Sequence, residues 1–207
     1  MGGSRLERLA PLAGALFGVV IAIGVVAGGE PLDSDASAEE VIKHYDDGKF
    51  IIGIIMLALG AILFMFFAAT LRKHLIASGP EWLGSLGFGG AIVFAVGMGG
   101  FASSQFALVD AADQKNLAAA QALNLIDSNN FPPAVIGISV FLLATAWHVL
   151  SSRSLPRWIG WMSLVIGILA LLGPLGILAF LLLAPWSFIV GIVLYRRGAA
   201  SVSPVAA

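Results

Sequence analysis

Residues 50–71 of the chain read FIIGIIMLALGAILFMFFAATL, a stretch that contains no charged side chain. A helix needs roughly 20 apolar residues to cross the hydrocarbon core of a bilayer. This stretch therefore predicts a transmembrane helix. The basic pair Arg72-Lys73 follows it directly, as is typical where a span ends at a membrane surface.

The composition of the whole chain indicates that lipid is its main partner. Of the 207 residues, 59% are hydrophobic and only 11% are charged, whereas a soluble domain carries roughly 25% charged residues. A formal net charge of −1 argues against a basic, nucleic-acid-binding surface. The chain has no cysteine, which excludes disulfides, thiolate metal sites, iron–sulfur clusters and covalent c-type haem.

Six apolar stretches predict an all-α fold, a polytopic bundle that forms a single membrane domain over residues 1–207. The predicted spans are Leu9–Gly28, Phe50–Leu71, Trp82–Val109, Pro132–Leu150, Trp158–Leu172 and Leu175–Tyr195. The third is about 40 Å long as a helix, so we expect it to tilt or to protrude. Only Gly173-Pro174 separates the fifth from the sixth. The two could form one interrupted segment, but their combined length favours a tight helical hairpin.

Basic residues predict that both termini lie in the cytoplasm, because Lys and Arg concentrate in cytoplasmic loops. Eight of them fall on one side of the six-span arrangement, namely Arg5, Arg8, Arg72, Lys73, Arg153, Arg157, Arg196 and Arg197. Acidic residues, Asp110 and Asp127 among them, are expected to face outward. A cleaved signal peptide is the alternative interpretation of the N-terminus, with Leu12–Ala27 as its apolar core.

Two segments between spans predict short helices on the outer side. Ser37-Ala38-Glu39-Glu40 has the pattern of a capping box, which places a surface helix near Ser37–Asp46. The second helix is expected near Asp113–Asp127. Its apolar stripe consists of Leu117, Ala120, Leu123 and Ile126.

Small residues form a predicted helix-packing face on the third span. Gly90, Val93, Gly97, Gly100 and Ser104 recur at helical spacing. Helices in lipid associate by close packing, which small residues permit. The face could bind a partner or a second copy of the chain, but packing within the chain's own bundle is favoured.

Polar side chains inside the hydrocarbon region are few, and four define a candidate pocket. They are His148 and Thr145 on the fourth span, Ser163 on the fifth and Ser187 on the sixth. If they meet, they would line a small pocket open toward the cytoplasm. The alternative is that His148 is an interfacial residue bonded to a backbone carbonyl or a headgroup.

Enzyme motifs, metal sites and cofactor sites are not predicted. The leading functional hypothesis is a non-catalytic accessory or interaction subunit, alone or as a homo-oligomer. The second is a pore or carrier for a neutral or lipidic molecule, with the pocket near His148. The third is a membrane-embedded enzyme or a haem protein, with b-type haem between His74 and His148.

Four short segments resemble a known group of proteins. They are Asp35–Glu40, Leu155–Trp161, Pro185–Phe188 and Leu194–Arg197. In these segments the chain is similar to a broad group of small, uncharacterised, six-span membrane proteins that is frequent in actinobacteria. The resemblance implies the fold and a bacterial cytoplasmic (inner) membrane, and it supplies no catalytic residues.

Overall fold

The computed structural model describes residues 5–29, 32–46 and 50–200, and every regular element in these ranges is an α-helix. The helices are α1 (Arg5–Leu9), α2 (Leu12–Gly28), α3 (Ala38–Tyr45), α4 (Phe50–Ile76), α5 (Glu81–Asp113), α6 (Leu117–Ser128), α7 (Pro132–Ser152), α8 (Arg157–Ala170) and α9 (Leu175–Ala200). The all-α prediction is therefore confirmed for this part of the chain. Glu30, Asp47 and Lys49, which the charge pattern places on the outer side, lie outside the described residues.

Four helical stretches are long and apolar enough to cross a membrane. They are Phe50–Ile76, Glu81–Asp113, Leu117–Ser152, which contains α6 and α7, and Leu175–Arg197. Helices α2 and α8 are apolar too, but they are shorter, at 17 and 14 residues. The structure is thus that of a membrane-type helix bundle.

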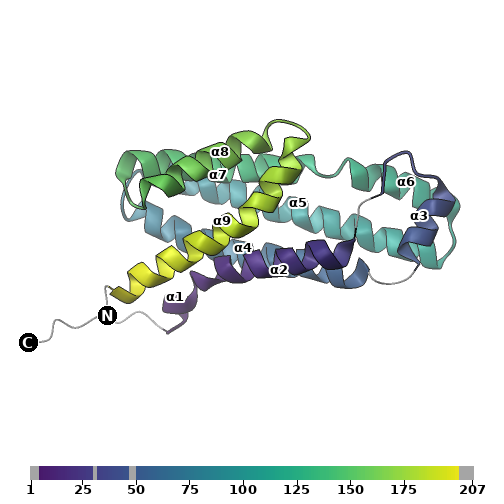
Figure 1. Ribbon diagram of the computed structural model, residues 1–207, viewed down its shortest axis with the longest axis horizontal. Coiled ribbons are helices and arrows are strands. Elements are labelled where there is room, and N and C mark those ends of the chain that lie inside the picture. The colour runs from purple at the N-terminus through teal and green to yellow at the C-terminus, as the bar shows by residue number, and fades with distance from the viewer. Residues whose placement is uncertain (1–4, 30–31, 47–49, 201–207) are drawn as a thin grey trace, which may run out of the picture.

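The two ends of the bundle differ (Figure 1). At one end, called the capped end here, α3 lies across the end of the bundle and α6 runs alongside the last turns of α5. The opposite end, called the terminal end, carries α1 and the last turns of α9. Helix α5 has 33 residues and is about 50 Å long at 1.5 Å per residue. It runs past its neighbours to reach α3 and α6.

The turn between α8 and α9 confirms the predicted hairpin. Helix α8 ends at Ala170 and α9 begins at Leu175. Gly173 has a φ of 57° in this turn, a left-handed conformation that glycine adopts without a steric cost. The following Pro174 cannot donate a backbone hydrogen bond to continue α8.

The predicted surface helices are both present, but the second begins later than expected. In α3, the hydroxyl of Ser37 accepts a hydrogen bond from the Glu40 N–H, and the Glu40 carboxylate accepts one from the Ser37 N–H, so the capping box is confirmed. Helix α6 begins at Leu117 instead of Asp113 because α5 continues through Asp113. The side chain of Asn116 then caps α6 by accepting a hydrogen bond from the Ala119 N–H.

Two separate hydrophobic cores hold the helices together. The larger core runs through the bundle and centres on Phe64, whose ring packs 4.7 Å from Phe94 and 5.0 Å from both Phe17 and Phe141, centroid to centroid. The smaller core lies at the capped end, where it joins α3, α6 and the ends of α4 and α5. Its buried residues are Val41, Tyr45, Phe50, Ile54, Ala102, Leu108, Val109, Ala111, Ala112 and Ala120.

Candidate functional site

His148 lies near the terminal end of α7 and is completely buried. Its ring packs against Gly79 in the loop between α4 and α5. A Cβ atom added to Gly79 would lie 2.8 Å from Nε2 of the ring. Neither ring nitrogen has a hydrogen-bond partner in the described part of the chain. The ring therefore faces protein, and Gly79 provides the space that it occupies.

The three hydroxyls of the predicted pocket each donate a hydrogen bond to a carbonyl of their own helix. Thr145 donates to Phe141, Ser163 to Ile159 and Ser187 to Ala184. Ser163 also accepts a hydrogen bond of 3.1 Å from the indole N–H of Trp186, which joins α8 to α9.

These residues lie at different helix contacts. The Thr145 hydroxyl is 3.9 Å from a Cβ added to Gly87 on α5, whereas the Ser187 carbonyl is 2.7 Å from a Cβ added to Gly14 on α2. Of the four predicted pocket residues, none is hydrogen-bonded to another. A pocket formed by these four side chains stays a prediction.

The second histidine of the haem hypothesis is engaged elsewhere. Nε2 of His74 lies 3.4 Å from the carbonyl oxygen of Ser154, in the loop after α7. In the described residues, no group of three or more His, Cys, Asp or Glu side chains has the arrangement of a metal site. Ligation of a haem iron by both rings stays a prediction.

The small-residue face of α5 divides into two parts. A Cβ added to Gly90 would lie 2.5 Å from the backbone N of Phe141, and one added to Gly97 would lie 2.7 Å from that of Ala134. This half packs on the backbone of α7. In the other half, Gly100 has only the side chain of Asn130 within 4 Å of an added Cβ, and Ser104 is hydrogen-bonded to Asp127 on α6.

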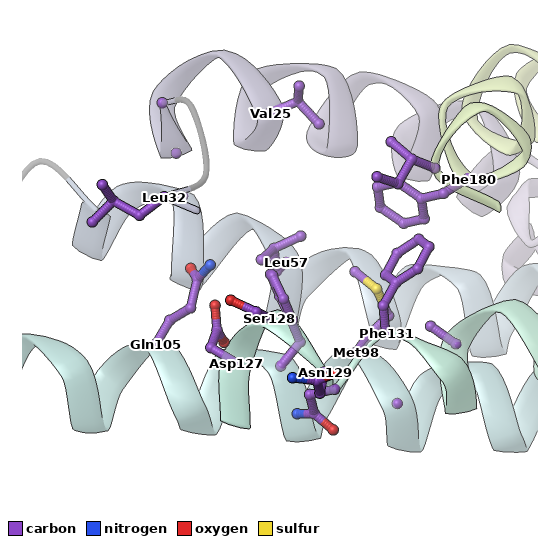
Figure 2. A pocket seen from close by; sticks show the side chains of 18 of the residues that line it. Val25, Leu32, Leu57, Met98, Gln105, Asp127, Ser128, Asn129, Phe131 and Phe180 are labelled. Carbon is purple, nitrogen blue, oxygen red and sulfur yellow. The ribbon is translucent and has the colours of Figure 1, made fainter. Parts of the chain in front are cut away.

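A cavity of about 630 Å³ lies at the capped end, between the two hydrophobic cores. Its apolar wall comes from α2, α4, α5, α7 and α9 and includes Val25, Leu57, Met98, Ala134, Phe131, Ile177, Phe180 and Leu181. Figure 2 shows the rings of Phe131 and Phe180 on this side, with their centroids 6.2 Å apart. The cavity volume falls within the range of known small-molecule sites.

Polar side chains form the wall nearest to α3 and α6. They include Asp33, Ser34, Gln105, Asn124, Asp127, Ser128, Asn129 and Asn130. Gln105 and Asp127 point into the space between the helices (Figure 2). The cavity is thus apolar where it enters the bundle and polar beneath the cap.

Asp127 organises this polar wall. Its side chain is only 9% exposed, and it accepts a hydrogen bond from the hydroxyl of Ser104 on α5. On the same face of α6, the side-chain amide of Asn124 donates a 3.0 Å hydrogen bond to the carbonyl of Asp33, in the segment before α3. These two bonds connect α6 to α5 and to the loop that leads into the cap.

Tyr45 closes the cavity from α3. Its ring packs 4.6 Å from that of Phe50, centroid to centroid, and only 3% of the residue is exposed. Burial, together with the nearby negative charge of Asp127, raises the pKa of the Tyr45 hydroxyl well above its usual value of about 10. The charge of Asp127 on α6 therefore affects the ionisation of Tyr45 on α3.

The buried face of α6 differs from its predicted apolar stripe. Leu117 and Ile126 are 45% and 57% exposed, while Ala120, Asn124 and Asp127 are buried. The prediction that Asp127 lies on the outer side of the membrane stays a prediction; within the fold, its carboxylate is buried and accepts a hydrogen bond from Ser104. Ala120, Asn124 and Asp127 recur at helical spacing, which is visible in the sequence. A search for hydrophobic residues does not select this face, because two of the three residues are polar.

One protein-family model matches most of the chain. A family model described as "Domain of unknown function (DUF4386)" matches residues 12–200. No curated protein and no solved structure matches the chain significantly. The family match extends from the start of α2 to the end of α9, so it includes both the bundle and the cap. The chain therefore belongs to this family of unknown function, DUF4386.

Proposed function

We propose that the chain is a multi-pass protein of the bacterial cytoplasmic membrane with six spans, both termini cytoplasmic and the capped end outside. The six apolar helices α2, α4, α5, α7, α8 and α9 support this number of spans. At the terminal end, Arg72, Lys73, Arg153 and Arg157 occupy the ends of α4, α7 and α8. Basic residues at one membrane face favour a cytoplasmic location for that face.

The two short helices fit this proposal if the membrane adapts to them. At 1.5 Å per residue, α2 is about 26 Å long and α8 about 21 Å, against about 30 Å for a hydrocarbon core. Both pack along longer helices, α2 between α4 and α9 and α8 against α7 and α9. Short spans are accommodated by local thinning of the bilayer at a modest free-energy cost.

We further propose that the protein binds an amphiphilic membrane molecule in the cavity beneath the cap. The carrying observation is the division of the cavity walls, with Leu57, Met98 and Phe180 on one side and Gln105 and Asp127 on the other. A lipid-like molecule presents the same division between its chain and its headgroup. In the proposed orientation, the polar wall lies near the outer membrane surface, at the depth where headgroups reside.

Binding of an amphiphile is compatible with a carrier, the second of the sequence-based hypotheses, but the cavity lies at the end opposite to His148. The accessory-subunit hypothesis and the homo-oligomer remain predictions. The packing of Gly90 and Gly97 on α7 uses part of the face that an oligomer would have needed.

A larger side chain that fills the cavity tests the proposed binding. Leu57 lines the cavity on α4, so Leu57→Trp adds bulk to the space that a chain would fill. Leu59, on the same helix, is 39% exposed and does not line it, so Leu59→Trp is the matched control. Native mass spectrometry of the proteins purified in mild detergent measures the lipid-like molecules that each retains.

We expect the wild-type protein and Leu59→Trp to retain a bound amphiphile and Leu57→Trp to lose it. Equal retention by both variants would place the molecule on the outer surface and contradict the proposal. A wild-type protein that retains no amphiphile, even after incubation with membrane lipids, would also contradict it. A stoichiometric protein partner in the same spectra would then support the accessory-subunit hypothesis.

A further inference from the structure

The charged groups of the cavity all have the same sign. Among the lining residues that the structure describes, Asp33 and Asp127 are acidic and none is Lys, Arg or His. Asp33 lies at the exposed rim, whereas Asp127 is buried. With both carboxyls ionised, the polar wall presents negative potential to anything that occupies the cavity; burial raises the pKa of Asp127, so a bound cation would favour its charged form.

The carboxylate of Asp127 is held by neutral groups. Ser104 donates a hydrogen bond to one of its oxygens, and the side chain of Gln105 is also within hydrogen-bonding reach. No ion pair of Asp127 with a Lys or Arg is present in the described part of the chain. A buried carboxylate is costly unless an opposite charge pairs with it, and here the cavity is the side from which such a charge can come.

Aromatic rings line the same region. Tyr45, Phe50 and Phe101 all contribute to the cavity wall, and the rings of Tyr45 and Phe50 are in contact with each other, with their centroids 4.6 Å apart. Aromatic faces attract ammonium groups through their quadrupoles, and desolvation strengthens this attraction. Among the common headgroups, one with a cationic nitrogen therefore best fits a wall made of a carboxylate and aromatic rings.

We propose that the cavity selects amphiphiles whose headgroup carries a positively charged nitrogen, with the headgroup beside Asp127 and the chain between Met98 and Phe180. This inference rests on the proposed function, because it names the ligand class of the same cavity. Anionic headgroups are disfavoured because they would meet two carboxylates and no described cation. Neutral headgroups gain the polar contacts but not the charge pairing.

The test compares probes that share one alkyl chain. Dodecylamine, dodecyltrimethylammonium, dodecanol and dodecanoate are titrated onto the full-length protein in nanodiscs of zwitterionic lipid, and their dissociation constants are measured after correction for partition into empty nanodiscs. The wild-type protein should bind the two cations roughly tenfold or more tightly than dodecanoate, the size expected from one charge-assisted contact. Dodecanol should fall between them.

Three variants test whether Asp127 causes the preference for cationic probes. Asp127→Asn should remove most of the preference for the two cations over dodecanoate. Asp110→Asn is the matched control, because Asp110 is exposed on α5 and does not line the cavity. Gln105→Lys puts a cation into the wall and should reverse the preference toward dodecanoate, which keeps the test decisive if Asp127→Asn does not fold.

The outcomes separate the two proposals. If the four probes bind with equal affinity to the wild-type protein and to Gln105→Lys, the cavity holds chains but the headgroup inference is wrong. If none of the probes binds, the proposed function itself is wrong. A cation preference that persists in Asp127→Asn and in Gln105→Lys would likewise overturn the role of this wall.

Discussion

The hydroxyl of Ser104 on α5 donates a hydrogen bond to the carboxylate of Asp127 on α6, and both side chains are buried beneath the cap. This contact joins the far end of the longest helix, α5, to α6, which runs alongside it. Its loss would leave a buried carboxylate without its hydroxyl donor, which has a free-energy cost.

Replacement of Ser104 by Ala should therefore destabilise the protein by about 1–3 kcal/mol, the usual cost of leaving a buried polar group unsatisfied. Ser103→Ala is the control, because Ser103 is exposed on the same helix. Unfolding in detergent, followed by circular dichroism, measures the difference. Equal stability of the two variants would show that the hydrogen bond contributes nothing.

Gly97→Leu should also lower stability, because an added Cβ would lie 2.7 Å from the backbone N of Ala134 on α7. Overpacking of this kind costs about 1–3 kcal/mol, and here the neighbouring backbone cannot rotate away. Gly99→Leu provides the comparison, since nothing lies within 4 Å of its added Cβ. If both variants unfold at the wild-type temperature, α5 and α7 are not closely packed at this point.

His148→Leu should leave stability unchanged or raise it. In the described part of the chain, both ring nitrogens are buried, and the backbone of Leu75, which lies near them, makes no well-aligned hydrogen bond with them; an apolar side chain removes the cost of their desolvation. Thr145→Val serves as the comparison, because it deletes a hydroxyl that is hydrogen-bonded to Phe141. A marked loss of stability in His148→Leu would instead reveal a bound molecule at the ring and favour the pocket predicted there.

The ionisation of Tyr45 should be shifted to high pH. The chain has two tyrosines, so Tyr195→Phe leaves Tyr45 as the single phenol in an ultraviolet titration. Because the folded-state pKa is raised, folding disfavours the phenolate, and stability should fall as pH rises above the unfolded pKa of about 10. Asp127→Asn should lower the pKa of Tyr45 part of the way, since burial persists. An unshifted titration in the folded protein would contradict the buried position of Tyr45.

The six-span orientation can be tested because the chain has no cysteine. Single cysteines at the exposed positions Asp35 and Gln121, on the capped side, should react with a membrane-impermeant maleimide in intact cells. Cysteines at Ser78 and Arg196, on the terminal side, should react only after the membrane is opened. The reverse pattern would invert the proposed topology.

Local sequence signals were enough to predict much of the fold. The capping box of Ser37 and Glu40 fixes the start of α3 within a few residues, and Gly173-Pro174 breaks the chain between α8 and α9 whatever surrounds it. The end of α5 was harder to predict. Its last turns, near Asp113, are polar on one side and are held as a helix by packing against α3 and α6, which the sequence of α5 alone does not show.

The candidate site was largely hidden from the sequence for a similar reason. A search for polar residues deep in the spans selected His148 and Ser163, whose surroundings are protein. Asp127 was expected on the outer side of the membrane from the distribution of charges, and that expectation says nothing about whether its side chain is buried. Its burial depends on Ser104, which lies 23 positions earlier in the chain, and on an α6 register that places Asn124 and Asp127 inward. Pairings at this distance are tertiary, so hydrophobic periodicity carries no information about them.

The short length of α8 has a consequence for the membrane around the protein. In a bilayer about 30 Å thick, a helix of about 21 Å leaves nearby acyl chains without a full-length apolar surface to pack against. The α8–α9 turn that ends this surface contributes Gly173 and Pro174 to the cavity wall. In the proposed six-span arrangement, acyl chains beside this turn are compressed where the cavity begins, and entry of a molecule from the bilayer at this point would relieve a local elastic strain.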